Sequence, residues 1–96
     1  MNKELPIRHI KIVISGHVQG VSFRWEAKRE ADLLGVSGYV RNNYDGSVYI
    51  EAEGTPDQLD AFIAWCHQGP SGAIVEEVNV SESKELQNYK SFLIRT

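Results

Sequence analysis

The sequence predicts an α+β domain with a ferredoxin-like split βαβ fold, in which an antiparallel sheet of four or five strands carries two helices on one face. Two observations support this prediction. Several short segments alternate apolar residues with a period of two, and two longer segments repeat them at helical spacing. Their order is β-α-β-β-α-β with a short final strand. Two helices cannot cover both faces of such a sheet, so we expect them on the same face.

The first expected strand covers residues 9–15, in which Ile10, Ile12 and Ile14 occupy every second position. A loop with two glycines and almost no charge follows the strand. The first expected helix covers residues 23–34, with an apolar stripe at Phe23, Ala27, Ala31 and Leu34.

Local signals mark the two ends of this helix. Ser22 can cap its start, because serine accepts hydrogen bonds from free backbone N–H groups there. Gly35 can end it, because glycine adopts the left-handed conformation that follows many helices.

A hairpin is expected next, with strands over residues 36–42 and 47–53. The Asp45-Gly46 pair between them is a strong turn signal, since glycine tolerates the positive φ of a tight turn. The residues expected to face the core are Val36, Gly38, Val40, Val48, Ile50 and Ala52.

The second helix is expected to open at Thr55, with Pro56 at its first position and Gln58 completing a capping box. Gly69-Pro70 should end it, and its apolar stripe is Leu59, Phe62, Ile63 and Cys66.

The last strands are expected over residues 73–80 and 91–96, with a polar turn region between them. We find no repeat, linker or low-complexity segment, so residues 1–96 are expected to form a single domain.

Composition narrows the function classes. The net charge of −3 argues against a nucleic-acid-binding module, which would show a clustered basic face. Cys66 is the single cysteine and cannot form an internal disulfide. No apolar run is long enough to span a bilayer, and the N-terminal residues lack a signal-peptide core. We therefore expect a cytoplasmic protein without a membrane partner, and a monomer.

The loop between the first strand and the first helix is the candidate site. Backbone N–H groups at a helix start lack partners and can bind an anion. Gly16 and Gly20 permit the backbone to converge on such an anion. Arg24 follows in the first helical turn, where it could grip phosphate or carboxylate with two parallel hydrogen bonds. From this pattern alone, an ordinary turn beside a solvated arginine is the more common interpretation.

Two long motifs change that balance. The stretch GHVQGVSFR resembles the acylphosphatase family signature G-x-V-Q-G-V-x-F-R, and GYVRNNYDGSV, at residues 38–48, resembles the second signature, G-[YW]-V-x-N-x-x-D-G-x-V. A weaker likeness is the Gly-Pro pair after the second helix, followed by AIVEEV. Ser22 stands where glycine or cysteine is more frequent in the family. The resemblance covers nearly the whole chain.

The resemblance implies a hydrolase that splits a small-molecule acyl phosphate into a carboxylate and inorganic phosphate, with phosphate as product and competitive inhibitor. It implies that Arg24 is the catalytic, phosphate-binding arginine and that Asn42 orients the attacking water. The phosphate cradle that it implies is the backbone of Gly16, His17, Val18, Gln19, Gly20 and Val21.

The chemistry of the residues agrees with this implication. Phosphoryl transfer through a loose transition state depends on positioning and charge stabilisation. A carboxylate leaves without protonation, so no general acid is required. No acidic cluster near the loop suggests a metal site, and no cofactor is expected.

Other candidates are weaker. His17 contributes only its backbone N–H in our interpretation, and His9 and His67 are isolated, with no metal-ligand spacing. Cys66 lies on an apolar stripe and is expected in the core. Asn43 and Asp45 are expected to form the turn that carries Asn42.

Three alternatives from other classes remain. Exposed aromatics on a ferredoxin-like sheet could stack RNA bases, although Glu51 and Glu53 share a strand face with Tyr49. A non-catalytic anion-binding module is a second alternative, which an intact Arg24–Asn42 pair disfavours. The third is the acylphosphatase-like domain of a hydrogenase-maturation carbamoyltransferase, but the chain shows neither zinc-finger cysteines nor a transferase region. The sequence does not identify the physiological acyl phosphate.

Overall fold

The predicted order of elements is confirmed in the computed structural model, which describes residues 6–96; part of the N-terminal stretch that lacks a signal-peptide core lies outside these residues. The elements are β1 (Arg8–His17), α1 (Phe23–Leu34), β2 (Ser37–Asn42), β3 (Val48–Gly54), α2 (Pro56–Gln68), β4 (Ile74–Ser83) and β5 (Phe92–Ile94).

The sheet has five strands in the order β4-β1-β3-β2-β5. Neighbouring strands are antiparallel except for β2 and β5, which pair in parallel over Gly38–Val40 and Phe92–Ile94. The sheet is therefore mixed, and the prediction of a wholly antiparallel sheet is wrong at this edge. The cause is that the chain leaves β4 at one edge and adds its last strand at the opposite edge, beside β2.

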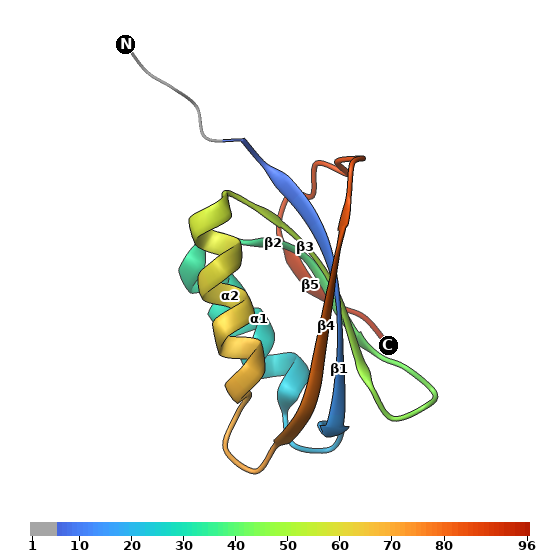
Figure 1. The fold of residues 1–96 in the computed structure, drawn as a ribbon. Helices are drawn as coiled ribbons and strands as arrows, with labels where there is room; N and C mark the ends of the chain where they lie inside the picture. Colours follow the sequence, from blue (N-terminus) through green and yellow to red (C-terminus); the bar gives the residue numbers. More distant parts are fainter. Residues whose placement is uncertain (1–5) are drawn as a thin grey trace.

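Both helices cover the same face of the sheet, as predicted, and lie side by side across it (Figure 1). The apolar stripes of the helices meet the inward side chains of the strands there, and this interface forms one core. Its largest fully buried apolar side chains are Phe23, Phe62, Phe92, Ile12, Ile14, Ile50 and Leu59.

The capping box of α2 is confirmed in both directions. The Thr55 hydroxyl accepts from the Gln58 backbone N–H at 3.3 Å, and Gln58 Oε1 accepts from the Thr55 backbone N–H at 2.9 Å. The capping role predicted for Ser22 is wrong, because its side chain makes no cap hydrogen bond. Ser22 has φ 63° and ψ 25°, whereas capping by a side chain requires an extended backbone at this position.

The face of the sheet without helices carries a buried polar network that the sequence did not predict. His9 is 1% exposed, and its two ring nitrogens lie 2.7 Å from Glu53 Oε2 and 2.7 Å from Glu51 Oε1. Burial alone would raise the pKa of Glu51, but hydrogen bonds from Tyr49, Tyr39 and His9 lower it below its ordinary value. His9 is therefore not an isolated residue.

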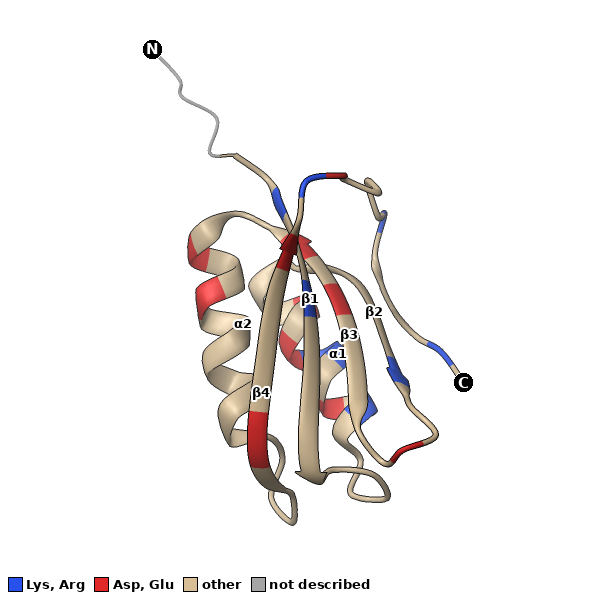
Figure 2. Cartoon of the chain, turned by 45° about the vertical axis from the view of Figure 1, so that its right-hand side comes forward, with Lys and Arg blue, Asp and Glu red and all other residues tan. Residues whose placement is uncertain are grey.

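The aromatic rings of this face are already in contact with cations. The guanidinium of Arg95 lies 3.9 Å from the ring centroid of Tyr39, and that of Arg41 lies 4.7 Å from Tyr49. Basic and acidic residues are scattered over the strands and helices (Figure 2). Among residues 6–96, no helix is long and apolar enough to cross a membrane.

Candidate active site

The loop between β1 and α1 begins with a close backbone contact. β1 continues to His17 through a register shift at Ser15/Gly16, so that it runs past the predicted end at Ser15. Gly16 has φ 130°, and a side chain there would collide with the backbone carbonyl of Ile74 in β4. Only glycine lets β1 and β4 approach this closely where the loop begins.

The loop then presents a series of unpaired backbone donors. Gly20 has φ 75° and open space where a side chain would stand. Within the described chain, the backbone N–H groups of residues 19–24 donate to no carbonyl or side chain, and the first helical bond runs from the Glu26 N–H to the Ser22 carbonyl. Because Ser22 makes no cap bond, the start of α1 keeps its donors free for an anion.

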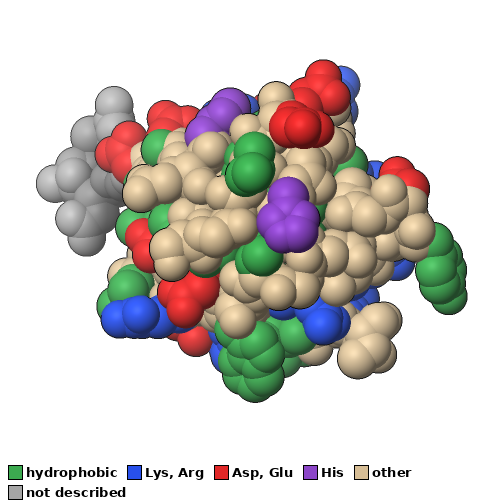
Figure 3. Space-filling view, turned by 90° about the horizontal axis from the view of Figure 1, so that it is seen from below, with side chains coloured by type: hydrophobic (Ala, Val, Ile, Leu, Met, Phe, Trp, Pro, Cys, Tyr) green, Lys and Arg blue, Asp and Glu red, His purple; other side chains and the backbone are tan. Residues whose placement is uncertain are grey.

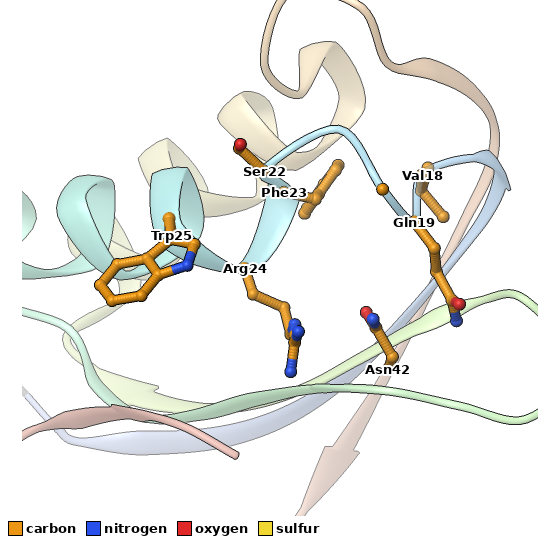
Figure 4. Close-up of a pocket in the computed structure, with 8 residues that line it drawn as sticks. Val18, Gln19, Ser22, Phe23, Arg24, Trp25 and Asn42 are labelled. Carbon is orange, nitrogen blue, oxygen red and sulfur yellow. The ribbon is translucent and has the colours of Figure 1, made fainter. Parts of the chain in front are cut away.

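These residues border an open pocket of about 290 Å³ (Figure 4). Its lining comes from the loop, the first turn of α1 and the end of β2, and consists of Val18, Gln19, Gly20, Ser22, Phe23, Arg24, Trp25 and Asn42. The lining contains one charged side chain, that of Arg24. The pocket therefore has the charge and the donors that suit a small anion.

A backbone acceptor holds the Arg24 side chain, which lines the pocket. Its Nη1 donates to the carbonyl of Arg95 at 3.0 Å, just beyond β5. A single bond to this carbonyl leaves most of the five guanidinium N–H donors for a ligand. The chain just after edge strand β5 thus helps to position the guanidinium of Arg24.

Asn42 is the last residue of β2, and its side chain faces that of Arg24 in the pocket (Figure 4). Its Oδ1 is buried and has no hydrogen-bond partner, and it is the only such side-chain atom among residues 6–96. A buried acceptor without a donor is costly, so this atom indicates a place for a ligand or water.

Gln19 fastens the loop to the hairpin that carries Asn42. Its Nε2 donates to the carbonyls of Asn43 at 2.8 Å and Ser47 at 2.9 Å. Asp45 in turn accepts from the backbone and hydroxyl of Ser47, so Asn43 and Asp45 form the turn as predicted. The loop and Asn42 are therefore held at a fixed separation.

The pocket brings together five of the eight predicted site residues, namely Val18, Gln19, Gly20, Arg24 and Asn42. The other three do not line it. Gly16 and His17 lie in β1 and pair with β4, and Val21 packs against the core. The roles predicted for all eight stay predictions.

Sequence reasoning missed Trp25 as a lining residue of this pocket. The sequence did contain an indication of this. Trp25 directly follows Arg24 in the first helical turn and does not belong to the apolar stripe of Phe23 and Ala27 that faces the core. The indole is 67% exposed. Ser22 and Phe23 also line the pocket without having been predicted there.

Other reactive groups lie outside the pocket. Cys66 is fully buried in the core, as predicted, and burial raises the pKa of its thiol well above the ordinary value. His17 and His67 are exposed. Residues 6–96 contain no group of three His, Cys, Asp or Glu side chains arranged to hold a metal ion. Seen from the end of the molecule at which the β1–α1 loop lies, the middle of the surface carries a histidine and a few hydrophobic side chains among backbone and uncharged polar atoms, and charged side chains lie around it (Figure 3).

Comparison with known proteins gives a consistent result. The family model described as Acylphosphatase matches residues 10–94. A curated acylphosphatase from Nocardioides sp. is 49% identical over 86 residues, which are 90% of this chain and 86% of that protein. One from Thermococcus kodakarensis is 48% identical over 84 residues, covering 85% of this chain and 90% of that protein.

Solved structures agree with these sequence matches. The crystal structure of acylphosphatase from Bacillus subtilis superposes with a TM-score of 0.90 at 35% identity, covering 93% of this chain and 99% of that one. The chain also matches part of a larger protein, full-length HypF in a phosphate- and nucleotide-bound form, with a TM-score of 0.91 at 35% identity. That match covers 100% of this chain and 13% of HypF.

Proposed function

The chain belongs to the acylphosphatase family of hydrolases, and we propose that it cleaves acyl phosphates by direct attack of water on a phosphoryl group held by the β1–α1 loop and Arg24. The single observation that carries this proposal is the buried, unpartnered Oδ1 of Asn42 in the same pocket as Arg24 and the free loop donors. We assign that oxygen to the attacking water.

The substrate phosphoryl group binds first. The backbone N–H groups from Gly20 to Arg24, which have no partner in the described chain, donate to its oxygens. The guanidinium of Arg24 adds charge-assisted hydrogen bonds from the side of β5. In this scheme Gly16 and His17 shape the start of the loop, and the side chain of Val21 anchors it to the core.

Water then attacks phosphorus. The Oδ1 of Asn42 accepts a hydrogen bond from the water, which orients a lone pair of the water oxygen toward phosphorus. The bond from phosphorus to the acyl oxygen breaks, and its electron pair leaves with the carboxylate. The fixed loop donors and Arg24 stabilise the charge of the transition state without reorganising. The water proton passes to solvent or to the phosphate product.

The leaving group explains the composition of the pocket. A carboxylate departs as a stable anion, so no acid is needed to protonate it. The pocket lining includes no Asp, Glu, His or Lys. The positive charge comes from Arg24 and from backbone donors, and the reaction as proposed uses no metal ion or cofactor.

We also propose that residues 1–96 form a single domain that works as a monomer in the cytoplasm, with inorganic phosphate as product and competitive inhibitor. The match of the chain to most of the length of curated acylphosphatases supports a single domain of this family. The single buried cysteine is compatible with a reducing compartment.

The test is a comparison of two substrates in excess EDTA. Benzoyl phosphate should be hydrolysed at least about 100-fold faster than p-nitrophenyl phosphate, because an absent general acid costs a poor leaving group about 10²–10⁴-fold. Phosphate release measures both rates. Comparable rates for the two substrates would contradict the proposal, as would activity that disappears in EDTA and returns with magnesium.

A further inference from the structure

An apolar groove adjoins the phosphate pocket along the exposed side of α1. It has a volume of about 390 Å³ and is lined by Trp25, Lys28, Arg29, Asp32 and Leu33. Trp25 is 67% exposed and Leu33 is 74% exposed, although both are large apolar side chains. Exposed apolar side chains that gather beside a site often mark a binding surface.

The groove borders the phosphate pocket at Trp25, which lines both. In the close-up, the indole lies on the opposite side of Arg24 from Asn42 (Figure 4). Lys28, which lines the groove between the two apolar residues, is held in place by hydrogen bonds. Its Nζ donates to Asp32 at 3.1 Å and to the Phe92 carbonyl at 2.8 Å. With its ammonium engaged there, the alkyl stem of Lys28 is available to cover apolar surface.

The geometry of phosphoryl transfer connects this groove to the reaction. The attacking and leaving oxygens lie roughly in line on opposite sides of phosphorus. If Asn42 holds the water, the acyl group must leave on the other side of the phosphoryl group, toward Trp25. This step rests on the proposed function and on the assignment of the water to Asn42.

We propose that the groove between Trp25 and Leu33 binds the acyl group of the substrate and selects acyl phosphates with a flat, apolar acyl group. The indole offers a face for an aromatic or extended apolar group, and Leu33 closes the far end. A small acyl group such as acetyl cannot reach beyond Trp25, so it gains little from the groove.

The test is the ratio of kcat/KM for benzoyl phosphate to kcat/KM for acetyl phosphate. In Trp25→Ala this ratio should fall about 3–10-fold, the range that loss of one aromatic contact predicts. Leu33→Ala should lower the ratio in the same direction by a smaller factor. Leu86→Ala is the matched control, because Leu86 is also exposed but lies between β4 and β5; its ratio should equal that of the unaltered protein.

Each outcome has a definite meaning. An unchanged ratio in Trp25→Ala overturns the acyl-binding groove, and so does an equal loss for both substrates, which would place Trp25 in the phosphate pocket alone. Trp25 is exposed, so its replacement is not expected to unfold the chain. If the unaltered protein hydrolyses neither substrate, the proposed function itself fails, which distinguishes that failure from failure of the groove.

Discussion

Replacing Arg24 with alanine should depress kcat/KM for benzoyl phosphate by about 10²–10⁴-fold. The guanidinium is the only charged side chain in the pocket lining, and two charge-assisted hydrogen bonds contribute about 1.5–3 kcal/mol each. Since we assign Arg24 to the phosphoryl group both before and during the reaction, the inhibition constant for inorganic phosphate should rise as well. Arg24→Lys should recover part of the activity, because an ammonium supplies the charge without the planar pair of donors.

Arg41, which lies in strand β2, provides the control for this experiment. Arg41 lies over the ring of Tyr49 and does not line the pocket, so Arg41→Ala should leave turnover and phosphate inhibition near normal. Full activity in Arg24→Ala, or full rescue by lysine, would contradict the two-pronged grip that we propose.

Replacing Asn42 with alanine should separate turnover from phosphate binding. We expect kcat to fall by at least about 10²-fold, as when one positioned polar group is lost from an active site. Inhibition by inorganic phosphate should stay near normal, because Asn42 is assigned to the water. Steady-state kinetics at several phosphate concentrations measures both quantities on the same preparation.

The control for Asn42 is Asn79, an exposed asparagine in strand β4, and Asn79→Ala should match the unaltered protein. Circular dichroism must first show that Asn42→Ala is folded, since Asn42 ends β2 beside the hairpin. If the variant keeps full turnover, the water-orienting role is wrong. If it loses phosphate inhibition instead, Asn42 belongs to the phosphate cradle.

The sequence predicted correctly those features that depend on residues close together in the chain, such as the ends of helices. The start of α2 followed from Thr55, Pro56 and Gln58, whose side chains and ring act within one helical turn. Gly35 ended α1 for the same reason, with φ 81° at the C-cap. The capping prediction for Ser22 was wrong, although serine is often found at helix starts. The loop holds the Ser22 backbone in the left-handed region, where the side chain makes no cap hydrogen bond.

Such local patterns did not predict the pairing of strands that are far apart in the sequence. No local pattern determines that β5 joins the sheet beside β2 in parallel, because either edge offers free backbone groups. The burial of His9 between Glu51 and Glu53 depends on the register of β1 against β3 across more than forty intervening residues.

The residues of the site also divide into those that the sequence indicated and those that needed the folded structure. The residues themselves made the glycine loop and Arg24 a candidate anion site, although an ordinary turn was the more common interpretation until the family resemblance was considered. Asn42 entered only through that resemblance. Its physical sign, an Oδ1 that is buried and unpartnered, exists only in the folded chain. Trp25 was visible in the sequence but needed the structure to show that it joins two pockets.

Attack of water on phosphorus can be tested by following the oxygen atom of the water into the products. Benzoyl phosphate should be hydrolysed in water enriched in a heavy oxygen isotope, and both products analysed by mass spectrometry against an enzyme-free reaction. We expect one heavy oxygen in the inorganic phosphate formed by the enzyme and none in the benzoate. Heavy oxygen in the benzoate would mean that water attacks the acyl carbon, and the roles assigned to the loop, Arg24 and Asn42 would be wrong.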